Sequence, residues 1–305
     1  MRAVNLRPLA RRQLPSTFPW RKPTWPGGVP RPPREKKTGA AFDTDWARRY
    51  PARLARAALV DWLVVPAVRT VADVTVDGAE RLGSLAGPVV FAANHHSHLD
   101  TSVLLGALPS QFRHRTVVAA AADYFFSNRI GGTAAALVLN AIPIERTKVN
   151  RRSAELATEL LEDGWSILIF PEGGRSPDGW GQEFRGGAAY LSVKVGVPVV
   201  PIHLAGTDRI LAKGMKRPQP GPVTVRFGNP MRPDDGEDAR AFGPRVEAAV
   251  AALADEHATD WWSARQRAAQ GTTPPLSGPE APQWRRAWAL GDRRPRRVVS
   301  RTWPW

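Results

Sequence analysis

The chain has 305 residues, a formal net charge of +15 and no cysteine, and 43% of its residues are hydrophobic. That hydrophobic share excludes disorder throughout the chain, and the absence of cysteine excludes disulfides, thiolate metal sites and a cysteine nucleophile. The length suits one large α/β domain with tails or two small domains, and the lack of cysteine fits a reducing, cytosolic setting.

The positive charge lies at the two ends of the chain. Residues 1–40 carry ten Lys or Arg and one acidic residue, residues 261–305 carry nine and two, and residues 41–260 are nearly neutral. Eight of the twelve tryptophans also lie in these ends. Because this mixture is favoured at an anionic lipid surface, we expect both ends to contact a membrane. Solvated basic tails without a partner and nucleic-acid binding are the alternatives.

The first part of the chain is predicted to be disordered and then helical. Residues 1–40 contain eight prolines and many arginines, which predicts disorder. Arg11 and Arg12 interrupt any apolar core, so no signal peptide is expected. Residues 45–72 predict a helix, with Pro66 as a kink or stop. This helix is apolar over much of its surface, so it either packs on the core or lies in a lipid interface.

An alternation of strands and helices follows, and it predicts an α/β fold with a mixed sheet flanked by helices. The longest mainly apolar, uncharged run, residues 130–144, falls short of the roughly 20 residues of a membrane span, so no transmembrane helix is expected. We expect the folded domain at residues 41–260, a linker at 271–282 and a basic, tryptophan-rich tail at 261–305. Strands are predicted at residues 89–93, 116–120, 166–170, 199–204 and 223–227, and helices at 100–108, 153–163, 187–195 and 244–267.

Polar residues follow the first of these strands, in the sequence NHHSHLD from Asn94 to Asp100. Loops at the carboxyl ends of strands are where open α/β sheets place their sites. Asp100 could accept a hydrogen bond from one ring nitrogen of His95, leaving the other to take a proton from a hydroxyl group. Two alternatives remain: the clustered histidines could bind a metal, or Asp100 could simply cap the following helix.

Three further segments carry weaker signals. The sequence FPEGGRS at 170–176 directly follows a predicted strand, and its glycines and Arg175 could hold an anion. It could equally be a glycine-rich turn with a surface arginine. Arg146 follows an apolar segment, where a solvated charge is the plain interpretation. The run VPVVPI at 197–202 predicts a buried strand with Pro201 at a bulge or edge.

Together, in this order and at these spacings, the four segments resemble the four motifs of the glycerolipid acyltransferase family, the lysophosphatidic acid acyltransferases and their relatives. The resemblance covers roughly residues 45–250. The third motif, F-P-E-G-T-R-S, is matched at six of seven positions, with Gly174 in place of threonine. The first motif, N-H-x-x-x-x-D, is matched by Asn94, His95 and Asp100, the arginine of the second by Arg146, and the fourth by Val197, Pro198 and Pro201.

The resemblance implies a role for each matched residue. His95 would act as general base on the acceptor hydroxyl and Asp100 would orient it, so that the hydroxyl attacks an acyl thioester without an acyl-enzyme. Ser97 ranks lower as a nucleophile, because it would need its own base and oxyanion hole. No metal or bound cofactor is implied. Arg146 and Arg175 would bind the acceptor's phosphate, Glu172 and Gly173 would belong to the acceptor site, and Pro201 would serve donor binding or site structure.

The resemblance also implies where the enzyme works and on what. Residues 45–72 occupy the place of a lead-in helical region that meets the membrane. The enzyme would then be a peripheral protein at the cytoplasmic face of the cell membrane. The acceptor would be a lysophospholipid, by default lysophosphatidate, and the donor acyl-CoA or acyl carrier protein. Glycerol 3-phosphate, another lysolipid or a glycolipid are alternative acceptors. A metal-dependent hydrolase, with His203 as a possible further ligand, is a rival. Nucleic-acid binding is not expected, because the cations lie on proline-rich ends rather than a folded face.

Overall fold

The computed structural model describes residues 38–145, 151–176, 179–212, 214–215 and 217–278. Nearly all of the predicted disordered segment 1–40 lies outside these residues, as does Arg146. The tail is described only as far as residue 278.

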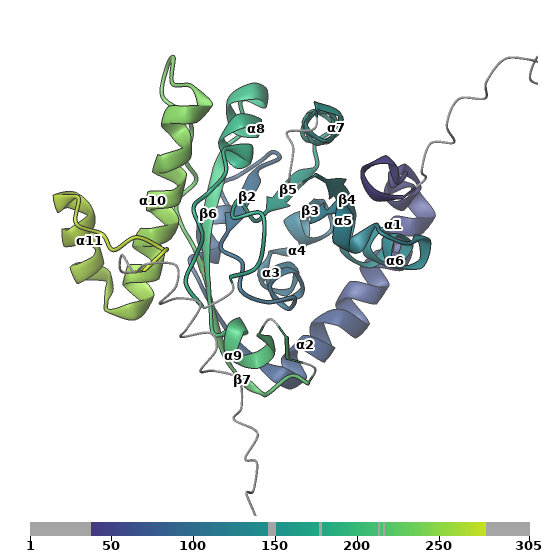
Figure 1. Ribbon diagram of the computed structural model, residues 1–305, viewed down its shortest axis with the longest axis horizontal. Coiled ribbons are helices and arrows are strands. Elements are labelled where there is room, and N and C mark those ends of the chain that lie inside the picture. The colour runs from purple at the N-terminus through teal and green to yellow at the C-terminus, as the bar shows by residue number, and fades with distance from the viewer. Residues whose placement is uncertain (1–37, 146–150, 177–178, 213, 216, 279–305) are drawn as a thin grey trace, which may run out of the picture. The chain divides into compact units, whose positions relative to one another are not determined.

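The described residues form a seven-stranded sheet in the order β1-β7-β6-β2-β5-β3-β4. Neighbouring strands run parallel except β6 and β7, which are antiparallel. The prediction of a mixed sheet flanked by helices is therefore confirmed (Figure 1). The strands are β1 (Ala72–Asp77), β2 (Val90–Ala93), β3 (Thr116–Ala121), β4 (Ala141–Ile144), β5 (Ser166–Ile169), β6 (Val199–Ala205) and β7 (Gly221–Phe227).

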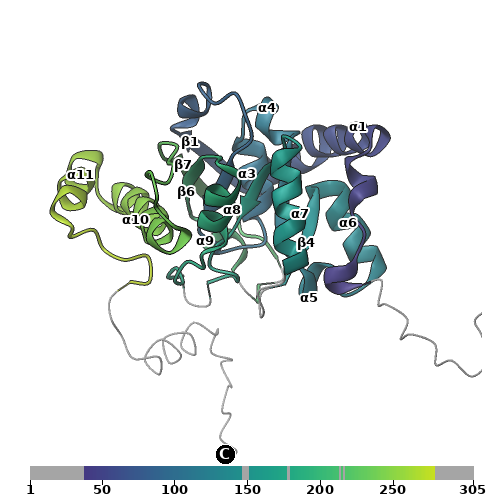
Figure 2. The same ribbon diagram turned by 90° about the horizontal axis from the view of Figure 1, so that it is seen from above.

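Helices cover both faces of the sheet (Figures 1 and 2). Phe91 and Ala93 of β2 belong to a core cluster with residues of α2, α3 and α9, whereas Val90 and Ala92 belong to a second cluster with residues of α7, α8 and α10. Successive side chains of a strand point to opposite faces, so β2 is buried on both sides. The helices are α1 (Tyr50–Leu59), α2 (Val65–Val71), α3 (Asp100–Ala107), α4 (Ser110–Arg113), α5 (Ala122–Phe125), α6 (Arg129–Leu139), α7 (Arg151–Glu162), α8 (Gly187–Val195), α9 (Thr207–Leu211), α10 (Ala239–Ala258) and α11 (Trp261–Gln270).

The predicted helix over residues 45–72 is present in part and differs in detail. A 3-10 turn at Asp45–Arg48 precedes α1, and a π-helical turn, Val60–Val64, joins α1 to α2. Pro66 lies in the first turn of α2 and does not stop the helix. The wider turn directly before it accommodates a residue that has no N–H for the helical ladder. The chain becomes extended at Ala72, where β1 begins.

The prediction of one helix over residues 244–267 is wrong, because two separate N-caps produce two helices. Asp238 accepts hydrogen bonds from the N–H groups of Arg240 and Ala241 at the start of α10. Asp260 accepts one from Ser263 at the start of α11. Short acidic side chains before a helix satisfy N–H groups that have no partner within the helix.

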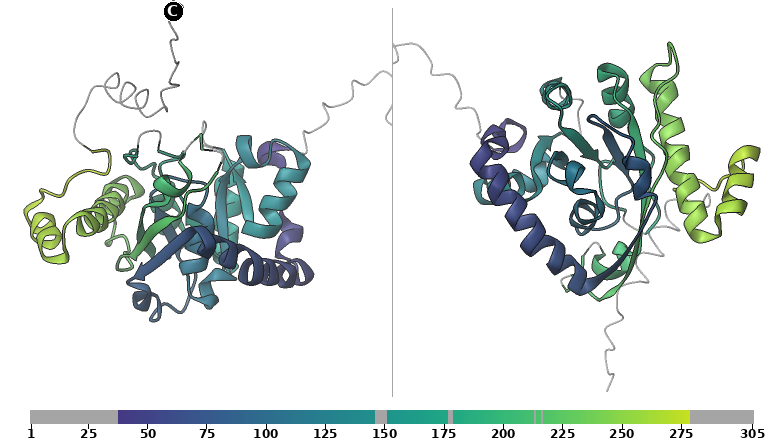
Figure 3. Two further views of the ribbon diagram at one scale, coloured as in Figure 1. Left: turned by 90° about the horizontal axis from the view of Figure 1, so that it is seen from below. Right: turned by 180° about the vertical axis from the view of Figure 1, so that it is seen from behind.

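The first part of the predicted tail belongs to the fold. Arg267 of α11 binds both carboxylate oxygens of Asp255 on α10, at 2.6 and 2.7 Å. Leu276 is buried and forms a cluster with Val250 and Ala251 of α10. Figure 3 shows α11 beside α10 at one end of the sheet. The predicted domain boundary at residue 260 therefore falls within described structure. No helix in the described part of the chain is long and apolar enough to cross a membrane.

Candidate active site

Asn94 fixes the start of the loop that follows β2. It is buried, its side-chain oxygen accepts the N–H of Leu204 at 2.7 Å, and its amide nitrogen donates to the carbonyl of Leu204 at 2.9 Å. The side chain thus pairs with β6 as a strand residue would, one position beyond the end of β2. The loop leaves the sheet from a fixed point, and His95 is its next residue.

His95 and Asp100 form the predicted pair. Asp100 Oδ2 accepts a hydrogen bond from His95 Nδ1 at 2.9 Å. The same oxygen accepts the backbone N–H groups of His96 and Ser97, at 2.7 and 2.8 Å. Asp100 is the first residue of α3 and is fully buried. One carboxylate therefore shapes the loop and orients the imidazole, and the Nε2 atom of His95 is left for other chemistry.

The loop after β5 holds His95 from the other side. Phe170 stacks on the imidazole, with ring centroids 4.2 Å apart. The backbone N–H of His95 donates to Glu172 Oε1 at 2.8 Å, and its carbonyl accepts the N–H of Ser176 at 2.8 Å. These contacts form because β2 and β5 are parallel neighbours, so the loops at their carboxyl ends meet. The ring and the backbone of His95 are thus both held by a loop that lies 77 residues further along the chain.

Glu172 is buried behind this loop. Its side chain is only 2% exposed, and its second oxygen accepts the N–H of Gln182 at 3.0 Å. Burial raises the pKa of Glu172 to about 7, although hydrogen bonds from the backbone of His95 and Gln182 act in the opposite direction. Both oxygens are thus engaged by the backbone. Glu172 therefore links the loop of His95 to the segment of Gln182.

Gly173 and Arg175 shape the outer part of the loop. Gly173 has a positive φ of 70°, and a Cβ there would lie 3.0 Å from the guanidinium carbon of Arg185. The positive φ favours glycine at this position, and any larger residue would also have to displace the end of the Arg185 side chain. Burial lowers the pKa of His98, and the positive charge of Arg175 lowers it further, so Arg175 lies within electrostatic reach of the loop that carries His95 and His98.

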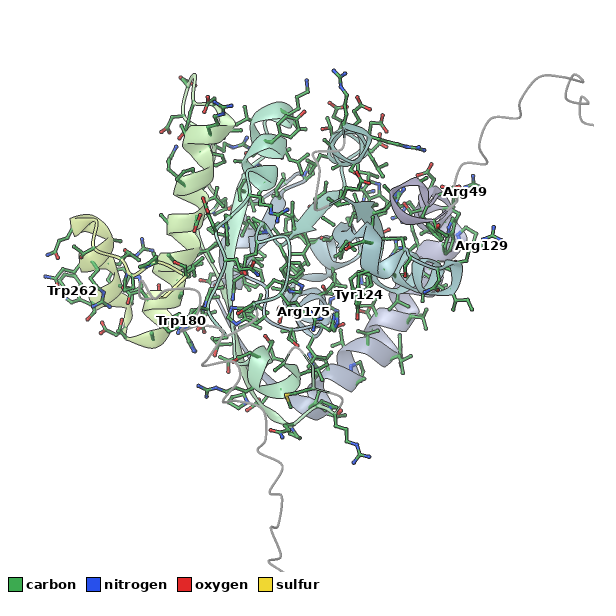
Figure 4. All side chains as sticks on the ribbon, in the orientation of Figure 1. Arg49, Tyr124, Arg129, Arg175, Trp180 and Trp262 are labelled. Atoms are coloured by element: carbon green, nitrogen blue, oxygen red, sulfur yellow. The ribbon has the colours of Figure 1, made fainter. Side chains whose placement is uncertain are left out.

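Tyr124 of α5 is a site neighbour that sequence reasoning missed. Its hydroxyl lies 3.0 Å from Nε2 of His98, and the two rings stack with centroids 5.2 Å apart. Figure 4 labels Tyr124 together with Arg175. The ring is exposed and faces the solvent side of the loop. Nothing in the sequence around Tyr124, AAADYFF, indicates that it contacts the loop from Asn94 to Asp100.

Ser97 and Pro201 have structural surroundings. The hydroxyl of Ser97 is buried, donates to the carbonyl of Leu211 at 2.7 Å and accepts the N–H of Leu99, which argues against a nucleophile. Pro201 is buried inside β6, and its carbonyl accepts the N–H of Gly228 at 2.8 Å. Proline has no N–H with which to return this bond, so the pairing of β6 with β7 stops here and β7 ends at Phe227. This burial favours a role in site structure over donor contact.

No three His, Asp or Glu side chains among the described residues are grouped as ligands for a metal ion. His203, the possible further ligand of a metal site, lies on β6 beside His257, with ring centroids 5.8 Å apart. Burial lowers the pKa of His203 to about 3.

Comparisons with known proteins bear on the same residues. Residues 73–205 match the sequence model of the Acyltransferase family. A chloroplastic 1-acyl-sn-glycerol-3-phosphate acyltransferase from Brassica napus is 35% identical over 142 residues, which cover 46% of this chain and 39% of that protein. The human 1-acyl-sn-glycerol-3-phosphate acyltransferase alpha is 29% identical over 179 residues, covering 57% of this chain and 61% of the relative. The chain thus spans about two fifths of the plant relative's length.

A solved structure matches as well. The crystal structure of the 1-acyl-sn-glycerophosphate acyltransferase PlsC from Thermotoga maritima aligns with a TM-score of 0.53 at 26% identity, covering 72% of this chain and 85% of that one. The region that matches the family model contains the loop from Asn94 to Asp100, together with Glu172, Arg175 and Pro201. Over residues 73–205 the chain is therefore similar to the acyltransferase family, and in particular to 1-acyl-sn-glycerol-3-phosphate acyltransferases.

Proposed function

We propose that this protein is an O-acyltransferase that transfers a fatty acyl group from a thioester donor to the free hydroxyl of 1-acylglycerol 3-phosphate. The donor is acyl-CoA or acyl carrier protein, and the product is phosphatidate, a precursor of phospholipids. The observation that carries the proposal is the buried Asp100 bound to His95 Nδ1 at 2.9 Å, in a loop clamped by Glu172. The similar plant and human proteins and the solved structure are named as acyltransferases of 1-acyl-sn-glycerol phosphates, which supports the choice of acceptor.

The geometry suits direct transfer. Nε2 of His95 takes the proton from the acceptor hydroxyl while its oxygen attacks the thioester carbonyl, giving a tetrahedral intermediate. Asp100 stabilises the imidazolium that forms. The intermediate then collapses and expels the thiolate of the donor. His95 gives this thiolate the proton that it took from the acceptor hydroxyl. The acyl group ends on the acceptor oxygen, and no covalent enzyme intermediate is formed.

An acyl-transfer assay tests this function. Purified full-length protein would be given acyl-CoA and a panel of acceptors: lysophosphatidate, other lysophospholipids, glycerol 3-phosphate and a lysoglycolipid. We expect the highest kcat/KM with lysophosphatidate. A higher value with another acceptor would correct the acceptor alone, whereas release of free CoA without any acylated acceptor would contradict the transferase.

Arg175→Ala should weaken the use of a phosphate-bearing acceptor. A charge-assisted contact is worth roughly 1.5–3 kcal/mol, so kcat/KM for lysophosphatidate should fall about 10- to 100-fold, with little change in the KM for the donor. Arg146→Ala should act in the same direction. Steady-state kinetics with each substrate varied in turn would measure both effects.

Arg240→Ala is the matched control, because Arg240 is an exposed arginine on α10. An acceptor KM that Arg175→Ala leaves unchanged would mean that the phosphate binds elsewhere or is not the recognised group.

We propose that the segment from α1 to α2 lies in the membrane interface, at the cytoplasmic face of the cell membrane. Its outward side is strongly apolar: Trp62 is 84% exposed and Leu63 is 61% exposed. The inward side is fixed by Asp61, which pairs with Arg113 at 2.9 Å and with His114 at 3.2 Å. Figures 1 and 3 show α1 and α2 along one flank of the sheet, where a lipid acceptor would enter. Large aromatic and aliphatic side chains of this kind partition into the interface.

The basic ends would add an electrostatic contact with anionic lipid. In the described part of the tail, Trp261 and Trp262 are 52% and 70% exposed, and Arg265 lies over the Trp261 ring. Each cation near an anionic surface contributes about 1 kcal/mol, so a few contacts would hold the domain at the bilayer.

Replacing Trp62 and Leu63 together by serine should reduce sedimentation of the full-length protein with phospholipid vesicles. Wild type should bind anionic vesicles better than neutral ones, and this preference should fade with salt, because the Debye length shrinks from about 10 Å at 0.1 M to about 3 Å at 1 M. Tyr190→Ser, on the exposed face of α8, is the control. Equal binding of both vesicle types would argue against the basic ends, and full binding by the double variant would argue against α1 and α2.

A further inference from the structure

Gln182 ties together the loop that carries Arg175. Its side-chain Nε2 donates to the carbonyl oxygens of Gly174 and Arg175, at 3.2 and 3.3 Å. Its backbone N–H donates to Glu172 Oε2 at 3.0 Å, and Oε1 of the same carboxylate accepts the N–H of His95 at 2.8 Å. Gln182 is thus hydrogen-bonded directly to the loop that carries Arg175, the arginine loop. Through the carboxylate of Glu172 it is also linked to the loop that carries His95.

This loop needs a restraint from outside. Two consecutive glycines, Gly173 and Gly174, precede Arg175, and the resembled motif has threonine at the second of these positions. Glycine widens the range of backbone conformations that a loop can visit, which would spread the positions of the arginine side chain. Two hydrogen bonds from one amide, to the carbonyls of Gly174 and Arg175, remove part of that freedom.

Gln182 is itself held by the C-terminal segment. The N–H of its neighbour Gly181 donates to the carbonyl of Leu276 at 2.9 Å. A Cβ at Gly181 would lie 2.9 Å from the Cβ of Leu276, so the two backbones approach as closely as glycine allows. Leu276 is buried against Val250 and Ala251 of α10. The amide of Gln182 therefore reaches the arginine loop from a fixed base.

We propose that Gln182 is a positioning residue, which holds the loop of Arg175 so that the arginine meets the acceptor while His95 meets its hydroxyl. The proposal rests on the acyltransferase function proposed above. Gln182 lies outside the four motifs and acts on Arg175 through the backbone of its loop.

The test compares wild type with Gln182→Met, which keeps the length of the side chain and removes its donor, and with Gln182→Ala. Losing two neutral hydrogen bonds should raise the KM for lysophosphatidate about tenfold. The KM for acyl-CoA should stay at its wild-type value, and the melting temperature should fall by only a few degrees. Glu183→Ala, at the exposed neighbouring residue, is the control and should change neither KM.

A second variant separates positioning from general stability. Gly173 has a positive φ but Gly174 does not, so threonine can adopt the backbone conformation at position 174. Gly174→Thr in the Gln182→Met background should lower the KM for lysophosphatidate again and leave the KM for acyl-CoA unchanged, whereas recovered stability alone would not act on one KM only.

Two results would overturn the role of Gln182: an unchanged KM for lysophosphatidate in Gln182→Met, or an equal rise in both KM values together with a lower melting temperature. Calorimetric binding of lysophosphatidate makes the same comparison without turnover. An equal dissociation constant for wild type and Gln182→Met would overturn the role even if no turnover is found. Absence of turnover in wild type would instead overturn the proposed function.

Discussion

Replacing His95 by alanine should abolish acyl transfer while the protein stays folded. The imidazole is the group placed to take the proton from the acceptor hydroxyl, and a hydroxyl that keeps its proton is a weak nucleophile. The loop should survive, because it is held through backbone groups: the N–H of His95 binds Glu172 and its carbonyl binds Ser176. Initial rates at saturating donor and acceptor, with circular dichroism on the same sample, would measure the effect.

His96→Ala is the matched control, since His96 is the next residue in the loop and only its backbone N–H binds Asp100. We expect it to retain most of the activity. Turnover near the wild-type rate by a folded His95→Ala variant would rule out the proposed base. Inhibition of wild type by chelators, reversed by added zinc, would favour the metal interpretation of the histidine cluster.

Asp100→Asn should be nearly as severe. The substitution keeps the size of the side chain but removes the charge that stabilises the imidazolium, and it can favour the wrong tautomer of His95. In the serine proteases the same change of the triad aspartate lowers kcat by about 10⁴-fold, and we expect a loss approaching that size. Oδ2 accepts three hydrogen bonds, so an asparagine that placed its NH2 group there would face three donors and lose all three bonds.

The pH dependence of kcat would distinguish a loss of orientation from a loss of folding. A folded Asp100→Asn variant that still uses His95 as base should be slow at every pH between 6 and 9, and its melting curve should remain cooperative. Activity within tenfold of wild type would mean that Asp100 serves mainly to shape the loop through the N–H groups of His96 and Ser97 and contributes little to the chemistry.

The central strands could be predicted from the sequence because they are buried on both faces. β2, β5 and β6 appear as continuous apolar runs, which is a strong local signal. β1, with the sequence ADVTVD, is missing from the predicted strands because it follows α2 without a loop, and its first residue, Ala72, falls inside the predicted helix at 45–72. β4 is a four-residue edge strand that contains a proline, a residue that weakens a strand prediction.

The candidate site divides in the same way. His95 and Asp100 are five residues apart, so their contact could be inferred from one loop. The surroundings of Glu172 could not, since its burial depends on the packing of three separate segments. Tyr124 and Gln182 reach the site through tertiary contacts alone, and neither sits in a pattern that marks it.

The hydrogen bond between Gly181 and Leu276 limits how far the chain can be shortened at its C-terminal end. All four motifs lie before residue 205, where the family match ends, and a gene fragment designed around them would look complete. Such a fragment would lack α10, α11 and the segment that ends at residue 278, and so would lack the support on which Gln182 rests. Expression boundaries should therefore be placed after residue 278, and fusion partners at this end should be joined beyond that point.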